Sequence, residues 1–329
     1  MFDNNGDLGL KHEKNEQFHL NQKNARKIIL NAVETTEPTW KQYNIKWEDI
    51  DYLFIQRGYE QGGFNTSKFS ELLINENIFS INKIGSFLDH FNYNRTYNRD
   101  FAGSYESSFY KDLKNGKAGK EGKGFYSAVR NFKANKGSHY YQLLWWMLVC
   151  CNNLKHKHDA SFSIFLKTKY SKFNKKSIND HEFLNISKDE WESFKESKPW
   201  NELLGIGENV FDFIMGDLVD NDEKDLEFVK DSYKLDDSNI RFLKVTGICK
   251  EPYHDKVVQY LMILELPYTI REINKGIYSY CSKTALEEVE NGVYMVDPKN
   301  HGFCHPDRCD KCNVKEICEK DFENYKKPI

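Results

Sequence analysis

The most apolar segment of the chain lies between residues 139 and 153. Its apolar side chains fall on every side of a helix rather than along one stripe, which predicts a core helix covered by other helices. The uninterrupted apolar part, Leu143 to Cys151, is too short to cross a bilayer, because a membrane-spanning helix needs about 20 residues. A chain that contains such a helix must supply several others to bury it.

Helical spacing of apolar residues recurs along the rest of the chain. It predicts helices over residues 22–34, 67–73, 79–91, 125–133, 162–170, 188–196, 257–264 and 270–282, and a turn followed by a helix within 200–220. Residues 49–56 fit either a helix or a strand. Few stretches alternate in the way that hairpin strands do, so we predict a mainly α fold.

Length and composition restrict the class of protein. With 329 residues, the chain is long enough for one large or two ordinary domains. It is 39% hydrophobic and 15% aromatic, which excludes a disordered chain. Its first residues lack the basic and apolar regions of a signal peptide. We therefore expect a cytoplasmic monomer that does not bind membranes.

Two stretches are predicted to lack regular structure. Residues 1–24 are polar and rich in asparagine, so we expect a frayed arm. Residues 114–124 interleave four glycines with lysines. They predict a mobile basic loop that serves either as a linker or as a surface for phosphates.

Charge is unevenly distributed along the chain, although the net charge is only −3. Residues 110–137 hold eight basic side chains against two acidic ones, and residues 154–176 hold seven against one. Residues 216–238 hold nine acidic side chains against three basic ones. Each run alone is typical of a solvated surface, but two basic runs together favour a polyanionic partner such as DNA.

The segment Leu203-Leu204-Gly205-Ile206-Gly207 predicts a tight turn that leads into a helix. Glycines allow backbone conformations and close approaches that a side chain would prevent. The free N–H groups and the dipole at a helix start bind anions, and a DNA phosphate is one of these. Gly-x-Gly alone is a weak signal, because many ordinary turns contain it.

Two carboxylates, Asp236 and Asp237, stand at the start of the next predicted helix. The helix dipole and the first-turn N–H groups keep a carboxylate ionised there. Such a group can stabilise the positive sugar that forms when an N-glycosidic bond breaks, or it can activate water. Either residue could instead simply cap the helix.

Four of the eight cysteines are clustered near the end of the sequence, at Cys304, Cys309, Cys312 and Cys318. Clustered cysteines without a secretory signal indicate metal ligands rather than disulfides. Four thiolates at this spacing hold either an iron–sulfur cluster or a structural zinc ion.

Taken in this order, the three motifs resemble those of the helix-hairpin-helix (HhH-GPD) superfamily of base-excision DNA glycosylases. The similar branch is that of endonuclease III and the adenine glycosylase MutY, which carries a C-terminal iron–sulfur loop. The resemblance covers residues 139–320. Asp237-Ser238-Asn239-Ile240 resembles the family signature Asp-x-Asn/His-aliphatic, whose Asp is the catalytic carboxylate.

The resemblance implies a two-lobed helical fold that binds double-stranded DNA. It implies a glycosylase core over residues 139–300 and a [4Fe-4S] loop over 301–329, with an N-terminal region, 1–138, that could contribute to the base pocket. The gap between Cys304 and Cys309 is shorter than is usual in the family, so zinc remains the alternative metal. The acidic residues 217–231 form an insertion that the family does not explain.

The resemblance also assigns residues to the DNA interface. Gly205, Ile206, Gly207 and Asn209 would belong to the phosphate-binding hairpin. Bifunctional members carry a nucleophilic lysine at the position of Asn209. The chain is therefore expected to be a monofunctional glycosylase without AP-lyase activity.

A second group of expected DNA contacts follows the apolar helix. Asn152 resembles the polar residue that fills the gap left by the flipped base, with Lys155 and Lys157 close by. Residues 124–131, Gly-Phe-Tyr-Ser-Ala-Val-Arg-Asn, resemble another segment of the same family. That alignment is incompatible with the first and would move the start of the catalytic domain upstream, to about residue 49.

Two other functions are compatible with the sequence. The first is a DNA-binding protein with a structural metal and no catalytic activity. The second is a nuclease in which Asp217, Asp220, Asp222 and Asp225 hold Mg²⁺.

Overall fold

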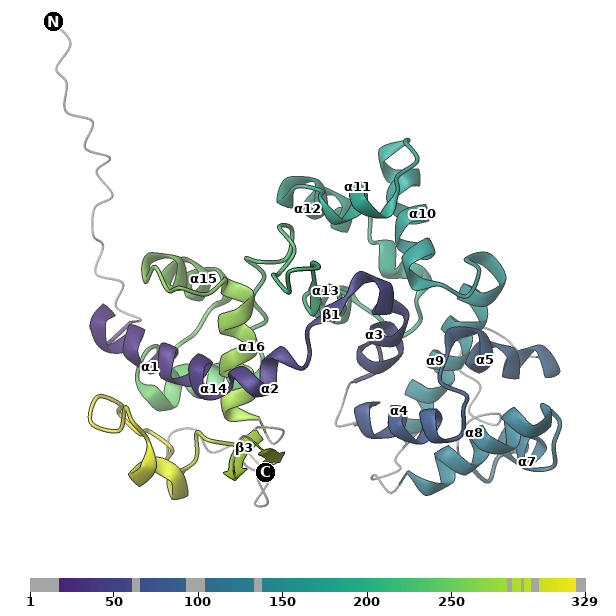
Figure 1. Ribbon diagram of the computed structural model, residues 1–329, viewed down its shortest axis with the longest axis horizontal. Coiled ribbons are helices and arrows are strands. Elements are labelled where there is room, and N and C mark those ends of the chain that lie inside the picture. The colour runs from purple at the N-terminus through teal and green to yellow at the C-terminus, as the bar shows by residue number, and fades with distance from the viewer. Residues whose placement is uncertain are drawn as a thin grey trace, which may run out of the picture. The chain divides into compact units, whose positions relative to one another are not determined.

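The structure is a computed structural model, which describes residues 18–60, 66–92, 104–132, 138–282, 286–290, 293–296 and 302–323. The fold is mainly helical, as predicted from the sequence (Figure 1). Contacts divide the chain into two compact units. One comprises residues 43–232, and the other combines residues 1–42 with 233–329. Each described unit has its own hydrophobic core.

The 43–232 unit is built from consecutive helices. They are α3 (Ile50–Arg57), α4 (Thr66–Asn75), α5 (Ile81–Ser86), α7 (Ser108–Lys114), α8 (Gly119–Asn131), α9 (Ser138–Lys157), α10 (Phe162–Asn174), α11 (Asp180–Leu184), α12 (Lys188–Glu196) and α13 (Glu208–Met215). Short 3-10 helices lie at Trp47–Asp49, Phe87–His90 and Pro199–Glu202. Two short parallel strands, β1 (Ile45–Lys46) and β2 (Leu218–Val219), pair near the ends of this unit's chain segment.

Helix α9 contains the most apolar segment of the sequence. Its residues 143–145 and 147–151 are all buried in the unit's core, as predicted for a helix that is apolar all round. Helix α5 packs closely against it. A Cβ atom at Gly85 would lie 2.6 Å from the carbonyl oxygen of Cys151, so only glycine permits this approach of the two backbones.

The second unit begins with α1 (Gln22–Thr35) and α2 (Glu37–Lys41) and resumes with α14 (Asp237–Thr246), α15 (His254–Ile263) and α16 (Ile270–Cys281). Helix α1 starts where the Asn21 side chain accepts a hydrogen bond from the Asn24 N–H, at 2.9 Å. Its apolar stripe faces α16, which also contacts α2, α14 and α15. Strands β3 (Leu286–Glu290) and β4 (Val293–Val296) form an antiparallel pair, and a 3-10 helix lies at Pro306–Lys311.

The predicted domain boundaries differ from this division. The boundary between residues 138 and 139 falls inside the 43–232 unit, because α9 shares one core with the helices that precede it. Residues 139–300 likewise do not form one body, since the chain leaves the first unit at about residue 232. The N-terminal helices α1 and α2 pack with the C-terminal helices instead, as the ribbon shows (Figure 1).

The prediction of a mobile basic loop at 114–124 is wrong. Helix α7 extends to Lys114, and after one turn α8 begins at Gly119. Gly116 and Gly119 have positive φ and form the turn between the helices, whereas Gly122 serves helix packing, since a Cβ atom there would lie 3.1 Å from a methyl group of Leu113. Residues 1–17 of the predicted N-terminal arm lie outside the described residues.

Candidate functional site

The segment predicted to form the hairpin lies in the 43–232 unit and consists of α12, a 3-10 turn and α13, which we call the hairpin. Leu203 and Ile206 are buried and anchor the turn in the core. Gly205 has φ +79°, and a Cβ atom there would lie 2.2 Å from Cε3 of Trp146. Glycine at 205 is therefore required by both the backbone conformation and the indole ring beneath it.

Gly207 differs from Gly205 in exposure, in backbone conformation and in the space around it. It is exposed, has φ −100°, and a Cβ atom there would meet no atom of the described chain within 4 Å. It is the N-cap residue of α13, and no side-chain hydrogen bond caps this helix in the described structure. The start of α13 can thus be approached closely from solvent, and Asn209 is exposed in the same turn.

A hydrogen bond holds the hairpin to α9, and an ion pair joins the hairpin's own two helices. The Cys150 thiol donates to the Leu204 carbonyl oxygen at 3.6 Å. Lys195 on α12 pairs with Asp212 on α13, with 3.4 Å between nitrogen and oxygen. Burial raises the pKa of Asp212, and the nearby Lys195 opposes that rise. The turn is therefore held in place by contacts from helices outside it.

Asp237 is the first residue of α14 and is exposed. The cap position belongs to Asp236, whose carboxylate accepts hydrogen bonds from the backbone N–H and the side-chain amide of Asn239, at 2.9 and 3.0 Å. Tyr233 donates to the other side of the Asn239 amide at 2.8 Å. Of the two carboxylates that the sequence offered as caps, Asp236 performs that role.

Helix α14 also anchors the cysteine-rich loop. The Arg241 guanidinium, one turn after Asp237, donates to the Cys304 carbonyl oxygen at 2.9 Å. At the other end of the helix, the backbone N–H groups of Glu319 and Asp321 donate to the Thr246 and Val245 carbonyls, at 3.2 and 2.9 Å. The same short helix thus carries the exposed carboxylate and both ends of the loop.

All four clustered cysteines line one small cavity of about 30 Å³, together with Tyr280, Phe303 and His305. Within the described ranges, no group of three or more His, Cys, Asp or Glu side chains is arranged as a metal site. The four cysteines nevertheless line one mostly apolar cavity, and four thiolates are a donor set that iron–sulfur clusters and structural zinc ions use.

Burial and the neighbouring sulfurs raise the pKa of Cys318 to about 11. At the inner end of the loop, the Cys281 thiol on α16 donates to Cys304, and this hydrogen bond lowers the pKa of Cys304. Cys281 lies outside the four-cysteine spacing, so the sequence pattern did not identify it.

Asn152 does not lie where the sequence predicts it. Helix α9 continues to Lys157, and Asn152 is 6% exposed. Its amide donates to the Gly85 carbonyl at 2.7 Å and to the Asp89 carboxylate at 2.8 Å. The side chain joins α9 to α5 and to the 3-10 helix that follows it, so in this structure Asn152 is not exposed for the predicted contact with DNA.

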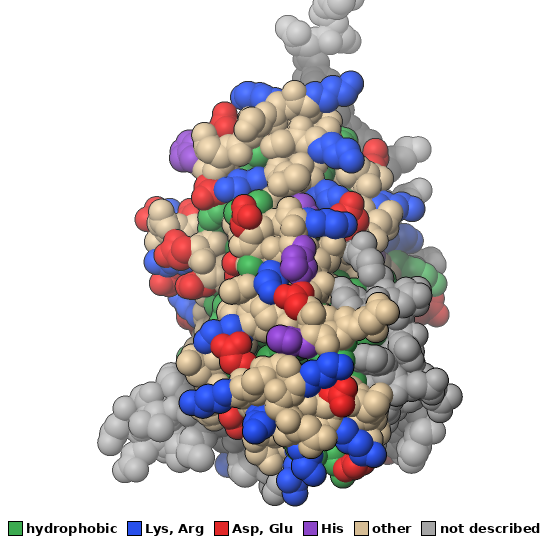
Figure 2. Space-filling view, turned by 90° about the vertical axis from the view of Figure 1, so that its right-hand side faces the viewer, with side chains coloured by type: hydrophobic (Ala, Val, Ile, Leu, Met, Phe, Trp, Pro, Cys, Tyr) green, Lys and Arg blue, Asp and Glu red, His purple; other side chains and the backbone are tan. Residues whose placement is uncertain are grey.

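Four of the seven lysines in the basic segment 154–176 pair with acidic side chains. Lys155 pairs with Asp89, and other pairs join Lys167 to Asp180, Lys169 to Glu202 and Lys176 to Glu182. Lys157 is exposed. Figure 2 shows Lys and Arg side chains interspersed with Asp and Glu over the described surface in that view, rather than gathered in one patch.

The acidic residues that could have formed a Mg²⁺ site have other partners. Asp217 is buried and accepts a hydrogen bond from Arg57 at 3.1 Å. Asp220 accepts from the backbone N–H groups of Asp222 and Lys224, both at 2.9 Å, and so stabilises its own turn. These contacts account for two of the four carboxylates.

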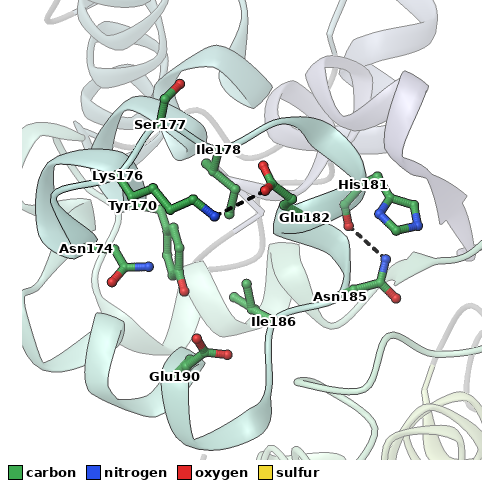
Figure 3. Close-up of a pocket in the computed structure, with 10 residues that line it drawn as sticks. All are labelled: Tyr170, Asn174, Lys176, Ser177, Ile178, His181, Glu182, Asn185, Ile186 and Glu190. Carbon is green, nitrogen blue, oxygen red and sulfur yellow. Dashed lines mark hydrogen bonds and ion pairs between the residues drawn. The ribbon is translucent and has the colours of Figure 1, made fainter.

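A larger cavity, of about 340 Å³, lies among α10, α11 and α12 (Figure 3). Tyr170 and Ile186 line it together with polar side chains that include Asn174 and His181, and an ion pair of 3.3 Å joins Lys176 to Glu182. None of the predicted site residues lines this cavity.

Comparisons with protein-family models, with curated proteins and with solved structures find nothing that matches this chain. Among the described helices, none is both long and apolar enough to cross a membrane. The site residues that sequence reasoning missed are Trp146, Arg241 and Tyr280. No local motif marks them, because each acts on a segment far away in the sequence.

Proposed function

We propose that this chain is a monofunctional DNA glycosylase, which flips a damaged or modified base out of double-stranded DNA and hydrolyses its N-glycosidic bond. The observation that carries this proposal is the arrangement of α14. Asp236 caps the helix, and the neighbouring Asp237 is exposed at its first turn. Arg241 on the same helix holds the cysteine loop.

Asp237 is the group to which we assign the chemistry. Breaking the bond between base and sugar develops positive charge on the sugar, and an ionised carboxylate lowers the energy of that transition state. It can also orient or deprotonate the attacking water. The first turn of a helix favours the ionised form, because the N–H groups and the dipole stabilise negative charge there.

The hairpin is the proposed phosphate site. Gly207 is exposed, and neither its φ nor any neighbouring atom of the described chain requires a glycine. A close approach of the DNA backbone to the N-terminus of α13 would explain the residue. Asn209 has no amine with which to form a Schiff base, so the product expected is an abasic site in an uncut strand.

The four cysteines are the proposed ligands of a [4Fe-4S] cluster, with zinc as the alternative. Either group, when bound, would tie the ends of the loop together through thiolate bonds and so brace it. Exposed basic residues of the loop, such as Lys311, could then meet the DNA backbone. A brown protein with broad visible absorption would indicate iron–sulfur, and a colourless zinc protein would indicate the alternative.

With Asn152 buried, the alignment through residues 124–131 supports the proposal better than the one that uses α9. Those residues form most of α8, and Arg130 and Asn131 are exposed at its end.

The decisive experiment compares two neighbouring substitutions. Asp237→Asn should abolish base release while DNA binding changes little. Asp236→Asn is the matched control, because asparagine caps helices as well as aspartate does and the change in charge is the same. It should keep most of the activity. Base release by Asp237→Asn at the wild-type rate would refute the catalytic assignment.

The substrate is found with a panel of duplex oligonucleotides that carry different damaged and modified bases, each scored for alkali-labile sites. Wild-type protein should produce alkali-labile sites in at least one of these oligonucleotides, and it should still produce them when EDTA is present. No release from any substrate would favour a non-catalytic DNA-binding protein. Cleavage that needs a divalent metal would favour a nuclease.

A further inference from the structure

The C-terminal end of α16 meets the cysteine loop through Tyr280. The Tyr280 hydroxyl oxygen lies 3.6 Å from Sγ of Cys312. On its other side, Nδ2 of Asn31 donates to the same hydroxyl oxygen at 3.2 Å. Tyr280 is buried and lines the cavity that the four cysteines share. Its hydroxyl therefore stands between α1 and the loop.

The direction of these hydrogen bonds follows from the chemistry of the groups. An amide nitrogen can only donate, so the Tyr280 oxygen accepts from Asn31. The single proton of the hydroxyl is then available to the sulfur of Cys312. A thiolate bound to a metal is an acceptor, and a hydrogen bond to a charged acceptor is stronger than one between neutral groups.

We propose that Tyr280, oriented by Asn31, is a positioning residue for the metal group: its hydroxyl donates a hydrogen bond to the Cys312 thiolate. The inference rests on the proposed metal centre. Hydrogen bonds from residues outside the ligand set orient metal ligands and tune the metal, and their loss typically weakens metal binding about 10- to 100-fold. They also contribute to the reduction potential of iron–sulfur clusters.

Two substitutions remove this hydrogen bond in different ways. Tyr280→Phe deletes the hydroxyl but keeps the ring, which stacks on Phe303 at 5.6 Å and meets the edge of Phe242 at 6.1 Å. Asn31→Asp keeps the Tyr280 hydroxyl but draws its proton away from Cys312, because the new carboxylate accepts a hydrogen bond where the amide donated one. The double variant should therefore be no worse than either single one.

Tyr260→Phe is the matched control. Tyr260 belongs to the same core and stacks on Phe18 at 3.9 Å. Its buried hydroxyl has no hydrogen-bond partner among the described residues. The control makes the same chemical change in the same unit without touching the cysteine cavity.

The full-length protein is purified without air, reconstituted with iron and sulfide or with zinc, and challenged with a chelator. Metal loss is followed by elemental analysis and, for iron, by visible absorption. Tyr280→Phe and Asn31→Asp should lose the metal about tenfold faster than wild type, and Tyr260→Phe should match wild type. With iron–sulfur, both variants should also shift the reduction potential to more negative values, because a donor to the thiolate favours the more negative reduced state.

The outcomes separate the two levels of the proposal. Folded Tyr280→Phe and Asn31→Asp proteins that keep the metal as long as wild type would overturn the role of Tyr280 alone. Wild-type protein that holds neither iron nor zinc after reconstitution would overturn the metal centre itself. If Tyr280→Phe fails to fold, the rate of metal loss from Asn31→Asp tests the role of Tyr280, because that substitution changes no aromatic packing.

Discussion

Replacing the two hairpin glycines by alanine should separate folding from DNA binding. At residue 205 the added Cβ atom would lie 2.2 Å from Cε3 of Trp146, on a backbone with φ +79°. A left-handed conformation costs a non-glycine residue about 1–2 kcal/mol, and overpacking of a core costs about 1–3 kcal/mol. Gly205→Ala should therefore lower the free energy of unfolding of the 43–232 unit by about 2–5 kcal/mol.

Gly207→Ala should leave folding nearly unchanged. Its φ is −100°, and the new methyl group would meet no atom of the described chain within 4 Å. The poorer N-cap costs less than about 1 kcal/mol. The methyl group would, however, stand where the proposed DNA phosphate would approach the α13 N–H groups. Loss of one hydrogen bond to a charged group, about 1.5 kcal/mol, corresponds to about tenfold weaker DNA binding.

The assay measures both properties on the same preparations. Thermal unfolding followed by circular dichroism gives stability, and fluorescence anisotropy of a labelled duplex at one fixed salt concentration gives DNA affinity, which varies strongly with salt. If Gly207→Ala binds DNA as tightly as wild type, the proposed phosphate site at the start of α13 is refuted. A wild-type melting temperature for Gly205→Ala would refute the packing of the turn on Trp146.

Two further predictions concern polar contacts in the same unit. Asp217→Ala should lower the free energy of unfolding by about 1–3 kcal/mol, because the buried Arg57 loses one carboxylate partner and keeps the other, Glu60. Urea unfolding measures this, and an unchanged midpoint would contradict it. Burial acts to raise the pKa of Asp89, but hydrogen bonds from Lys155, His156 and Asn152 outweigh it and lower that pKa. A carboxyl group whose pKa is lower in the folded than in the unfolded state stabilises the fold at pH values above its unfolded-state pKa, about 3.9. This stabilisation is lost as the pH falls through the folded-state pKa. Asp89→Asn should therefore flatten the acid side of the melting-temperature profile between about pH 5 and 3, and an unaltered profile would count against the network.

Local patterns predicted much of the secondary structure. The helix expected over residues 188–196 has those bounds in the structure, because a capping box between Ser187 and Glu190 defines its start. Helix α1 follows the same logic, since it buries one stripe of regularly spaced apolar side chains. Helix α16 has such a stripe too, but it is buried on nearly all sides. Periodicity and capping involve residues within a few positions of one another, so the sequence displays them directly.

Local patterns misled where a residue's role depends on distant segments. The four glycines of 114–124 predicted one loop, yet Gly116 and Gly119 form only a short turn, and Gly122 and Gly124 lie in a helix and pack against other segments. A glycine that permits close packing looks the same in the sequence as one that permits a turn. Asn152 was predicted at a helix end, but α9 continues past it and α5 covers it. The composition of a short stretch does not reveal what covers it.

For the candidate site, the sequence alone determined the types and order of the groups: a Gly-x-Gly turn, a pair of carboxylates and four cysteines at metal-binding spacing. Tertiary structure decided which of them solvent can reach. The hydrogen bonds that Asn239 donates to Asp236 identify Asp236 as the helix cap. The open space around Gly207 distinguishes that glycine from the tightly packed Gly205. Burial and hydrogen-bond partners come from segments far apart in the chain, and these are what make one of two similar neighbours structural and leave the other exposed to solvent.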